Sequence, residues 1–197
     1  MLFVVVIDNC SWMLDKCSNF GQKLPIIVIQ NQPYRLYGST NSCHEITGMD
    51  LDVLFILGTF SLLSVEGNNL QFKLLSLNVK GIRTFEKRKR IFNWLGKQNA
   101  DIYFLQETYS TEESENQWRK QWRGDLFFAH GTSQSKGTLI LIQEGLDFLI
   151  KSVQRDEMGT FIIVDALIQD SPFLLVNIYS PTKPCEQIQF LIKLHVS

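Results

Sequence analysis

Three polar residues that could do chemistry follow apolar runs typical of buried strands. Asn78 follows LLSL, Glu107 follows DIYFLQ, and Tyr179 follows LLVNI. In sheets with helical crossovers, sites are built at the carboxyl ends of strands. Magnesium takes carboxylate, water and phosphate oxygens as ligands, and asparagine and tyrosine can hydrogen-bond water or phosphate. Taken alone, each residue more often has no part in a site. A Glu after a strand is usually solvated, an Asn commonly begins a turn, and a Tyr often packs at the edge of a core.

Regular elements that could position these residues begin at Lys73. KLLSLNV predicts a strand over 73–79, and DIYFLQE predicts a second one over 101–107. Between them we expect a helix to about Gln98, capped by Thr84. Its expected apolar stripe consists of Phe85, Ile91, Trp94 and Leu95.

The rest of the chain alternates strand-like runs with turn residues. A polar stretch at 110–120 predicts a short helix, and the end from Cys185 predicts the start of another, with Ile188, Leu191 and Ile192 on one face. Five strands are expected at 125–131, 136–142, 146–153, 160–168 and 173–179. One helical crossover followed by a run of strands predicts an α+β fold, with mixed sheets and helices outside.

The order of these motifs resembles the endonuclease/exonuclease/phosphatase superfamily. LLSLNVKGI, FLQET, SKGTLILI, RDEMGTFIIVD and LLVNIYSPT follow one another with that superfamily's spacing. The likeness is greatest to the endonuclease domain of LINE-type (non-LTR) retrotransposons. It covers about residues 73–197, and we find no resemblance for residues 1–72.

The resemblance implies a magnesium-dependent phosphodiesterase that nicks DNA, built as a DNase I-like four-layered α/β sandwich. By that resemblance Glu107 and Asn78 are the metal-binding residues, and Tyr179 steadies the scissile phosphate. Magnesium would neutralise charge on the phosphoryl oxygens and stabilise the leaving oxygen.

The chain departs from the pattern of this superfamily after N-I-Y-S-P. The superfamily continues with G-D-F-N and, later, a paired aspartate and histidine, whereas the 197 residues contain no G-D-F-N. The last histidine, His195, lies in the helix expected before that motif. We therefore expect a partial sandwich whose C-terminal part is missing, with very low or no activity. We also expect an uncovered sheet face that a protein partner could cover.

A cluster of basic residues follows the first predicted strand. Lys80, Arg83, Lys87 and Arg88 are candidates for DNA phosphate contacts, and Lys87–Arg90 is an unbroken basic run. An equally good interpretation is a solvated helix face balanced by nearby glutamates. Such a run also resembles a weak nuclear localisation patch.

Residues 1–72 lack a sustained period and are interpreted as an unassigned, poorly ordered extension. They carry three basic and six acidic residues, a net charge of -3, against sixteen and fourteen, a net of +2, in 73–197. The run Leu51–Val65 is too short for a membrane helix and predicts a buried helix or strand pair. The four cysteines lack metal-ligand or disulfide-scaffold spacing, which favours an intracellular protein, with a nuclear location suggested only by the basic run.

Three functions remain open from the sequence. The first is a DNA endonuclease fragment of retrotransposon origin that has lost turnover. The second is a non-catalytic nucleic-acid or protein binding module. The third is a phosphatase or phosphodiesterase of the same superfamily acting on a small molecule or lipid, which the Q-E-T and N-I-Y-S-P motifs make less favoured than the first.

Overall fold

Two five-stranded sheets form the framework of the protein. The structure is a computed structural model, and it describes residues 2–8, 26–30, 60–67 and 70–180. Sheet A has the strand order β2-β1-β10-β9-β8, and sheet B has the order β3-β4-β5-β7-β6. Each sheet contains parallel and antiparallel pairs, so both are mixed as predicted.

The strands of sheet A come from both ends of the described chain. They are β1 (Leu2–Asp8), β2 (Ile26–Gln30), β8 (Phe148–Arg155), β9 (Phe161–Ile168) and β10 (Ser171–Tyr179). β1 pairs in parallel with both β2 and β10, whereas β8, β9 and β10 form antiparallel hairpins.

Sheet B holds the predicted crossover. Its strands are β3 (Phe60–Gly67), β4 (Leu70–Asn78), β5 (Ile102–Gln106), β6 (Gly124–Ala129) and β7 (Thr138–Gln143). β4 and β5 are parallel and are joined through helix α3 (Phe85–Leu95), which confirms the predicted strand–helix–strand unit. A 3-10 turn, η1 (Glu112–Ser114), and a short helix, α4 (Glu115–Arg119), follow β5.

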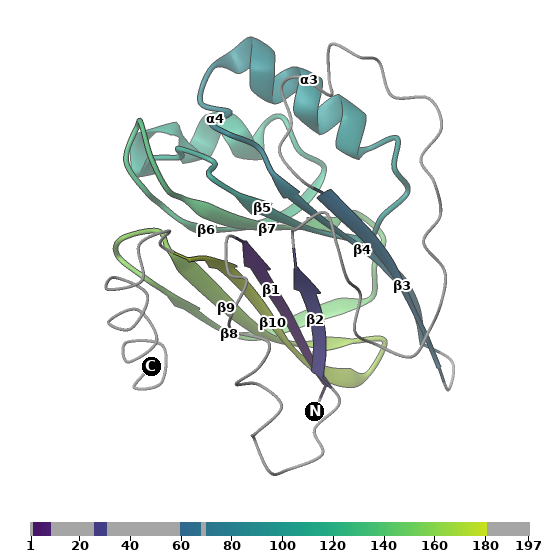
Figure 1. Cartoon of the computed structure of the whole chain (residues 1–197). Helices are drawn as coiled ribbons and strands as arrows, with labels where there is room; N and C mark the ends of the chain where they lie inside the picture. The colour runs from purple at the N-terminus through teal and green to yellow at the C-terminus, as the bar shows by residue number, and fades with distance from the viewer. Residues whose placement is uncertain (1, 9–25, 31–59, 68–69, 181–197) are drawn as a thin grey trace.

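The described elements stack in three layers, with α3 and α4 over sheet B and sheet A on its other side (Figure 1). Alternate residues of β4, β5 and β7 face opposite ways because side chains alternate along a strand. One set, including Leu74, Phe104 and Ile140, packs against β9 and β10 of sheet A. The inner faces of the two sheets thus cover each other. The helix expected from Cys185, which would add a fourth layer, lies outside the described residues.

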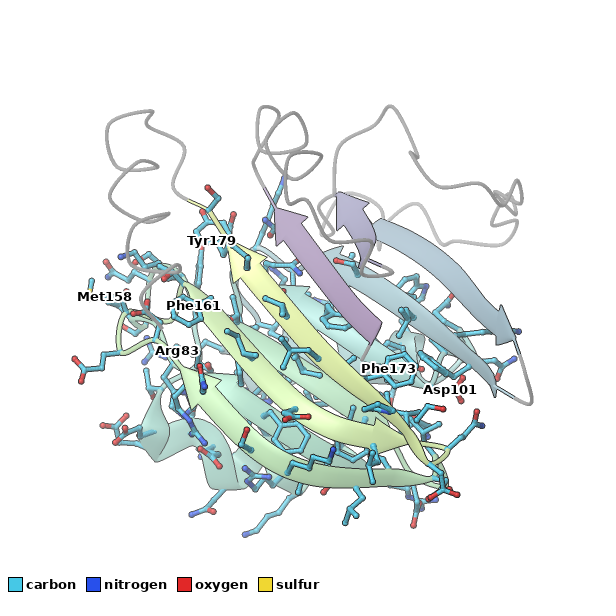
Figure 2. The ribbon with its side chains drawn as sticks, turned by 90° about the horizontal axis from the view of Figure 1, so that it is seen from below. Arg83, Asp101, Met158, Phe161, Phe173 and Tyr179 are labelled. Atoms are coloured by element: carbon cyan, nitrogen blue, oxygen red, sulfur yellow. The ribbon has the colours of Figure 1, made fainter. Side chains whose placement is uncertain are left out.

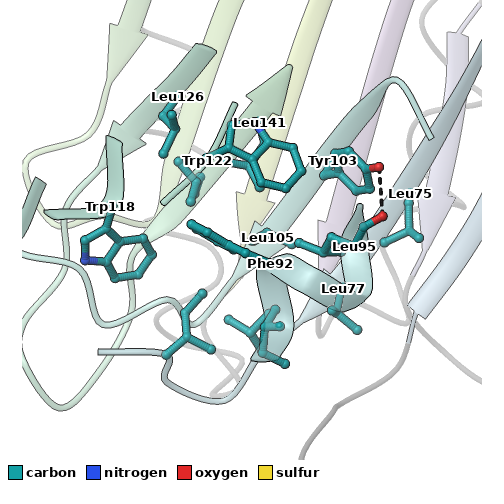
Figure 3. Packing of buried hydrophobic residues seen from close by; sticks show 14 of the residues in the cluster. Leu75, Leu77, Phe92, Leu95, Tyr103, Leu105, Trp118, Trp122, Leu126 and Leu141 are labelled. Atoms are coloured by element: carbon teal, nitrogen blue, oxygen red, sulfur yellow. Dashed lines mark hydrogen bonds between the residues drawn. The ribbon is translucent and has the colours of Figure 1, made fainter. Parts of the chain in front are cut away.

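The other set packs beneath the helices (Figure 3). Leu77, Leu105 and Leu141 lie under Phe92 and a group of aromatic rings from α4 and the segment after it. Those rings meet edge to face, with centroids 5.4 Å apart for Phe92 and Trp122 and 5.2 Å apart for Tyr103 and Trp122. The buried Tyr103 hydroxyl donates a 3.0 Å hydrogen bond to the Leu95 carbonyl, at the end of α3.

The apolar stripe of α3 differs from the prediction. Its buried residues are Arg88, Ile91, Phe92 and Leu95, at the i, i+3, i+4, i+7 spacing of one helix face. The predicted member Phe85 is 53% exposed. Thr84 is the N-cap residue, but its side chain makes no capping hydrogen bond.

Strands within residues 1–72 join the same two sheets as the rest of the chain. β1 and β2 extend sheet A, β3 extends sheet B, and β4 begins at Leu70, before the predicted start of the regular part. β3 also includes the end of the Leu51–Val65 run, whose first nine residues lie outside the described part. In the described part of the chain, no helix is long and apolar enough to cross a membrane.

Candidate active site

Asn78 and Glu107 meet at the paired ends of two parallel strands. Asn78 is the last residue of β4 and lies opposite Gln106, the last residue of β5, so Glu107 follows directly. The Asn78 Nδ2 amide donates a 2.9 Å hydrogen bond to Glu107 Oε1. Asn78 is buried and Glu107 is half-buried, so Glu107 lies at the sheet edge with part of the residue exposed.

The backbone after each strand turns sharply to place these side chains. Glu107 has a φ of +52° and Lys80 a φ of +45°, in the left-handed region that non-glycine residues seldom occupy. The Gly81 N–H donates to the Glu107 carbonyl at 2.6 Å, and the Ile82 N–H donates to the Thr108 carbonyl at 3.1 Å. These bonds join the loops after β4 and β5 and fix the position of Glu107.

The orientation of the Asn78 amide is set by a second hydrogen bond. Its Oδ1 accepts the Lys80 backbone N–H at 3.1 Å, which leaves Nδ2 facing the carboxylate. The structure therefore shows Asn78 as a residue that holds Glu107. Its predicted role as a direct metal ligand stays a prediction.

A polar bridge between the sheets lies directly behind the site. The Gln106 Nε2 amide donates to Asn177 Oδ1 at 2.7 Å, and Asn177 Nδ2 donates to the carbonyls of Leu105 and Leu139, both at 3.0 Å. Gln106 and Asn177 are both fully buried. We did not predict their role. The sequence did hold a signal for them. Each is a polar residue within an apolar strand, close to a predicted site residue, Gln106 in Q-E-T and Asn177 in N-I-Y.

Figure 2 shows Tyr179 at the end of β10. It lies two residues beyond Asn177, so both side chains lie on the face of β10 that faces sheet B. The Tyr179 N–H donates to the Thr160 carbonyl at 2.8 Å, which ties the strand end to the turn before β9. Its predicted contact with a phosphate stays a prediction.

Lys87 is tied to the site by its own hydrogen bonds. Its Nζ donates to the carbonyls of Val79 at 3.1 Å and Lys80 at 2.9 Å, so it holds the loop after β4. Burial and the nearby charges of Arg90 and Lys80 lower the pKa of Lys87, while Glu107 opposes this shift. Lys80 and Arg83 are exposed and remain available to a phosphate.

The prediction that Arg88 contacts DNA is wrong, because Arg88 is fully buried. Its guanidinium lies 4.8 Å from the centre of the Trp118 ring. Its Nη1 donates to the Arg83 carbonyl at 2.7 Å, and its Nε donates to Gln121 Oε1. The residue therefore connects α3 to the segment after α4.

His130 follows directly after β6 and contacts two side chains. Its ring nitrogens are 3.1 Å from Ser110 Oγ and 3.1 Å from Glu115 Oε2. Ser110 is fully buried, so this arrangement is a link between loops and cannot present a nucleophile to a substrate. In the described part of the chain, no group of three or more His, Cys, Asp or Glu side chains could hold a metal ion.

The residues present nevertheless suit magnesium. This ion keeps several waters and is commonly bound through one or two carboxylates plus substrate phosphates. Glu107 supplies one half-buried carboxylate at a strand edge, and exposed cations of the neighbouring loop could meet the phosphate. One protein carboxylate can therefore bind the ion, with water and phosphate oxygens as its other ligands.

Comparison with known proteins gives one curated relative. It is the Transposon TX1 uncharacterized 149 kDa protein of Xenopus laevis, which is 26% identical over 121 residues. The match covers 61% of this chain and 9% of that protein, so the chain spans about a tenth of its relative's length. No protein-family model matches the chain.

Among solved structures, three crystal structures of TDP2 from Caenorhabditis elegans are similar to the chain. A truncated form is 18% identical with a TM-score of 0.39, covering 55% of this chain and 47% of that one. A selenomethionine form has the same identity and TM-score, with 35% of that chain covered. The third is 19% identical with a TM-score of 0.39, and 36% of that chain is covered.

Proposed function

We propose that this chain carries part of a magnesium-dependent DNA endonuclease of retrotransposon origin, with Glu107 as its metal ligand. The observation that carries the proposal is the 2.9 Å bond from Asn78 to Glu107 at the paired ends of β4 and β5. The similarity to a transposon protein over 121 residues supports the origin. The motif order from LLSLNVKGI to LLVNIYSPT supports the reaction class.

The proposed roles follow from where the side chains lie. Glu107 holds the ion, and Asn78 keeps the carboxylate oriented through its amide. Magnesium, when bound, supplies charge neutralisation at the phosphoryl and leaving oxygens. Tyr179 steadies the scissile phosphate from β10, and the exposed Lys80 and Arg83 contact phosphates on either side.

Water activation is the step for which these residues offer no group. Glu107 and Tyr179 are already assigned to the metal and the phosphate, and His130 is bonded to Ser110 and Glu115. General-base help contributes about 10²–10⁴-fold to rate. We therefore propose that the chain binds metal and DNA while its nicking activity is very low or absent.

Divalent-metal binding is the first test. Mn²⁺, a paramagnetic substitute for magnesium, is titrated into the 197-residue protein, and free Mn²⁺ is followed by electron paramagnetic resonance. Saturable binding is expected in the wild type and is expected to be lost in Glu107→Ala. Glu144→Ala is the matched control, because Glu144 is exposed in the turn beyond β7 and lies at the opposite end of the sheet. Binding that survives in Glu107→Ala, or no binding in a folded wild type, would contradict the proposal.

Nicking of supercoiled plasmid in magnesium is the second test, with the same three proteins. Activity that disappears in Glu107→Ala but persists in Glu144→Ala would establish a working site and a source of water activation outside the residues named here. No nicking from a protein that binds Mn²⁺ through Glu107 is the expected result.

A non-catalytic nucleic-acid binder is the second candidate function. The exposed cations Lys80, Arg83, Lys89 and Arg90 on the loop after β4 and on α3 favour it. Salt-dependent DNA binding without any divalent metal, unchanged in Glu107→Ala, would favour this candidate over the first.

A further inference from the structure

The second oxygen of the Glu107 carboxylate is also held by a side chain. The Tyr109 hydroxyl donates to Glu107 Oε2 at 3.2 Å, while Asn78 holds Oε1 at 2.9 Å. The two donors come from different elements, one from β4 and one from the loop after β5. A carboxylate held at both oxygens has little freedom to rotate.

The backbone of this loop is shaped to return Tyr109 to Glu107. Both residues have positive φ angles, +57° for Tyr109 and +52° for Glu107, so both backbones are in the left-handed region. Such conformations cost about 1–3 kcal/mol each and persist where the surroundings determine them. Here the Tyr109 N–H donates to the Lys136 carbonyl at 3.0 Å, and the Thr108 N–H donates to the Gly137 carbonyl at 3.0 Å.

Gly81 leaves the space that the Tyr109 ring occupies. A Cβ atom at this position would lie 2.6 Å from the ring carbon Cε2, far inside van der Waals contact. Gly81 also has a φ of +75°, which favours glycine independently of the ring. The G of the LNVKG motif therefore serves the placement of an aromatic ring that the Q-E-T-Y segment supplies.

We propose that Tyr109 is a positioning residue that fixes the Glu107 carboxylate for a divalent cation. The inference rests on the proposed function, because it assigns a partner to the same carboxylate. Residues that orient a metal ligand typically change metal affinity about 10–100-fold when removed. Tyr109→Phe removes only the hydroxyl and keeps the ring against Gly81, so we expect Mn²⁺ affinity to fall about tenfold.

Tyr103→Phe is the matched control. Tyr103 is also a tyrosine whose hydroxyl donates one hydrogen bond, to Leu95 at 3.0 Å, but it lies in the core beneath α3. Loss of that bond should cost at least as much stability, because Tyr103 is almost fully buried. A merely structural role for the Tyr109 hydroxyl would make the two variants alike in Mn²⁺ affinity.

A second measurement does not require metal. In protein labelled with ¹³C-glutamate, the Glu107 carboxyl resonance is the one lost in Glu107→Gln. We expect it to move in Tyr109→Phe and to stay in place in Tyr103→Phe.

The outcomes separate the inference from the function on which it rests. Unchanged Mn²⁺ affinity and an unmoved resonance in Tyr109→Phe overturn the role of Tyr109 and leave the metal site standing. No Mn²⁺ binding by the folded wild type overturns the proposed function, and with it any metal role for Tyr109.

Discussion

Arg88 lies in a run of four basic residues, yet it is buried among α3, Trp118 and Gln121. The carbonyls of Ile82 and Arg83 accept from its Nη1 and Gln121 accepts from its Nε, whereas its buried Nη2 has no hydrogen-bond partner among the described residues. Charge alone therefore did not identify the residues available to a ligand. In a basic run on a helix, the members at the apolar spacing are the ones to assign to the core.

We expect the Arg88→Ala variant to unfold more easily than the wild type. It removes the hydrogen-bond partner of Gln121 and of two carbonyls, together with the contact with Trp118, so we expect a loss of about 3 kcal/mol in the free energy of unfolding. Urea denaturation measures it. The neighbouring Lys89→Ala is the control, because Lys89 is exposed and should change stability by less than about 0.5 kcal/mol. Equal stability of the two variants would contradict the structural role of Arg88.

At the scale of elements, the Gln106–Asn177 bridge holds β5 of sheet B against β10 of sheet A. Asn177→Leu would leave the Leu105 and Leu139 carbonyls without their buried side-chain donor. The Gln106 amide would lose its 2.7 Å acceptor and keep two others at 3.3 Å, Ser76 Oγ and the Phe104 carbonyl. Each such buried group costs about 1–3 kcal/mol, so we expect a total loss of about 3 kcal/mol in unfolding free energy. Thermal or urea unfolding tests this, with the exposed Asn93→Ala on α3 as the control. An Asn177→Leu variant as stable as the wild type would contradict a stabilising role for the bridge.

The junction of α4 with β6 predicts a pH dependence. Burial raises the pKa of Glu115, but hydrogen bonds from Arg119 and His130 outweigh it and hold the pKa below its ordinary value of 4.5. A carboxyl whose folded pKa is lowered stabilises the fold above its unfolded pKa. That contribution is lost as the pH falls through the folded pKa.

Unfolding free energy measured from pH 6 downward should therefore fall less steeply in Glu115→Gln than in the wild type. Glu112→Gln is the comparison, because Glu112 is exposed on the preceding turn. Identical pH profiles for all three proteins would contradict this account.

Helices and strands could be predicted from the sequence where the spacing of apolar residues and the turn residues indicated the same element. Contacts between residues far apart in the sequence could not be predicted. The strand–helix–strand unit from β4 to β5 and the five later strands were found from local pattern. The meeting of Asn78 with Glu107 was anticipated because carboxyl ends of neighbouring parallel strands share an edge. The partners of Gln106 and Tyr109 depend on chain segments far apart or on rare backbone angles, which a local pattern does not encode.

At the scale of the whole molecule, DNA binding should depend on the exposed cations near the site edge. Replacing Lys80 and Arg83 together by alanine removes two proposed phosphate contacts. The slope of log affinity against log salt should become shallower by about 1.8. Lys97→Ala is the control, since this exposed lysine follows the far end of α3. Fluorescence anisotropy at several salt concentrations measures the slope, and an unchanged slope in the double variant would remove these residues from the interface.

The inner faces of the sheets cover each other, so the uncovered face expected from the sequence is not one of these. A protein partner stays a prediction, as does the division of the chain at residue 72. β1 pairs with both β2 and β10, so strands from before and after residue 72 share sheet A.

The parallel pairing of β1 with β10 sets an order of events during synthesis. Leu2–Asp8 is the first of the described strands in the sequence, and its partner Ser171–Tyr179 is the last of them. Closing so long a loop is slow, because its entropy cost precedes any reward from pairing. β1 therefore waits until β10 has been made, and until then the edge that will meet β10 is available to other strands. A chain released before β10 is made would keep β4, β5 and α3, but β1 would have only one of its two neighbours, β2.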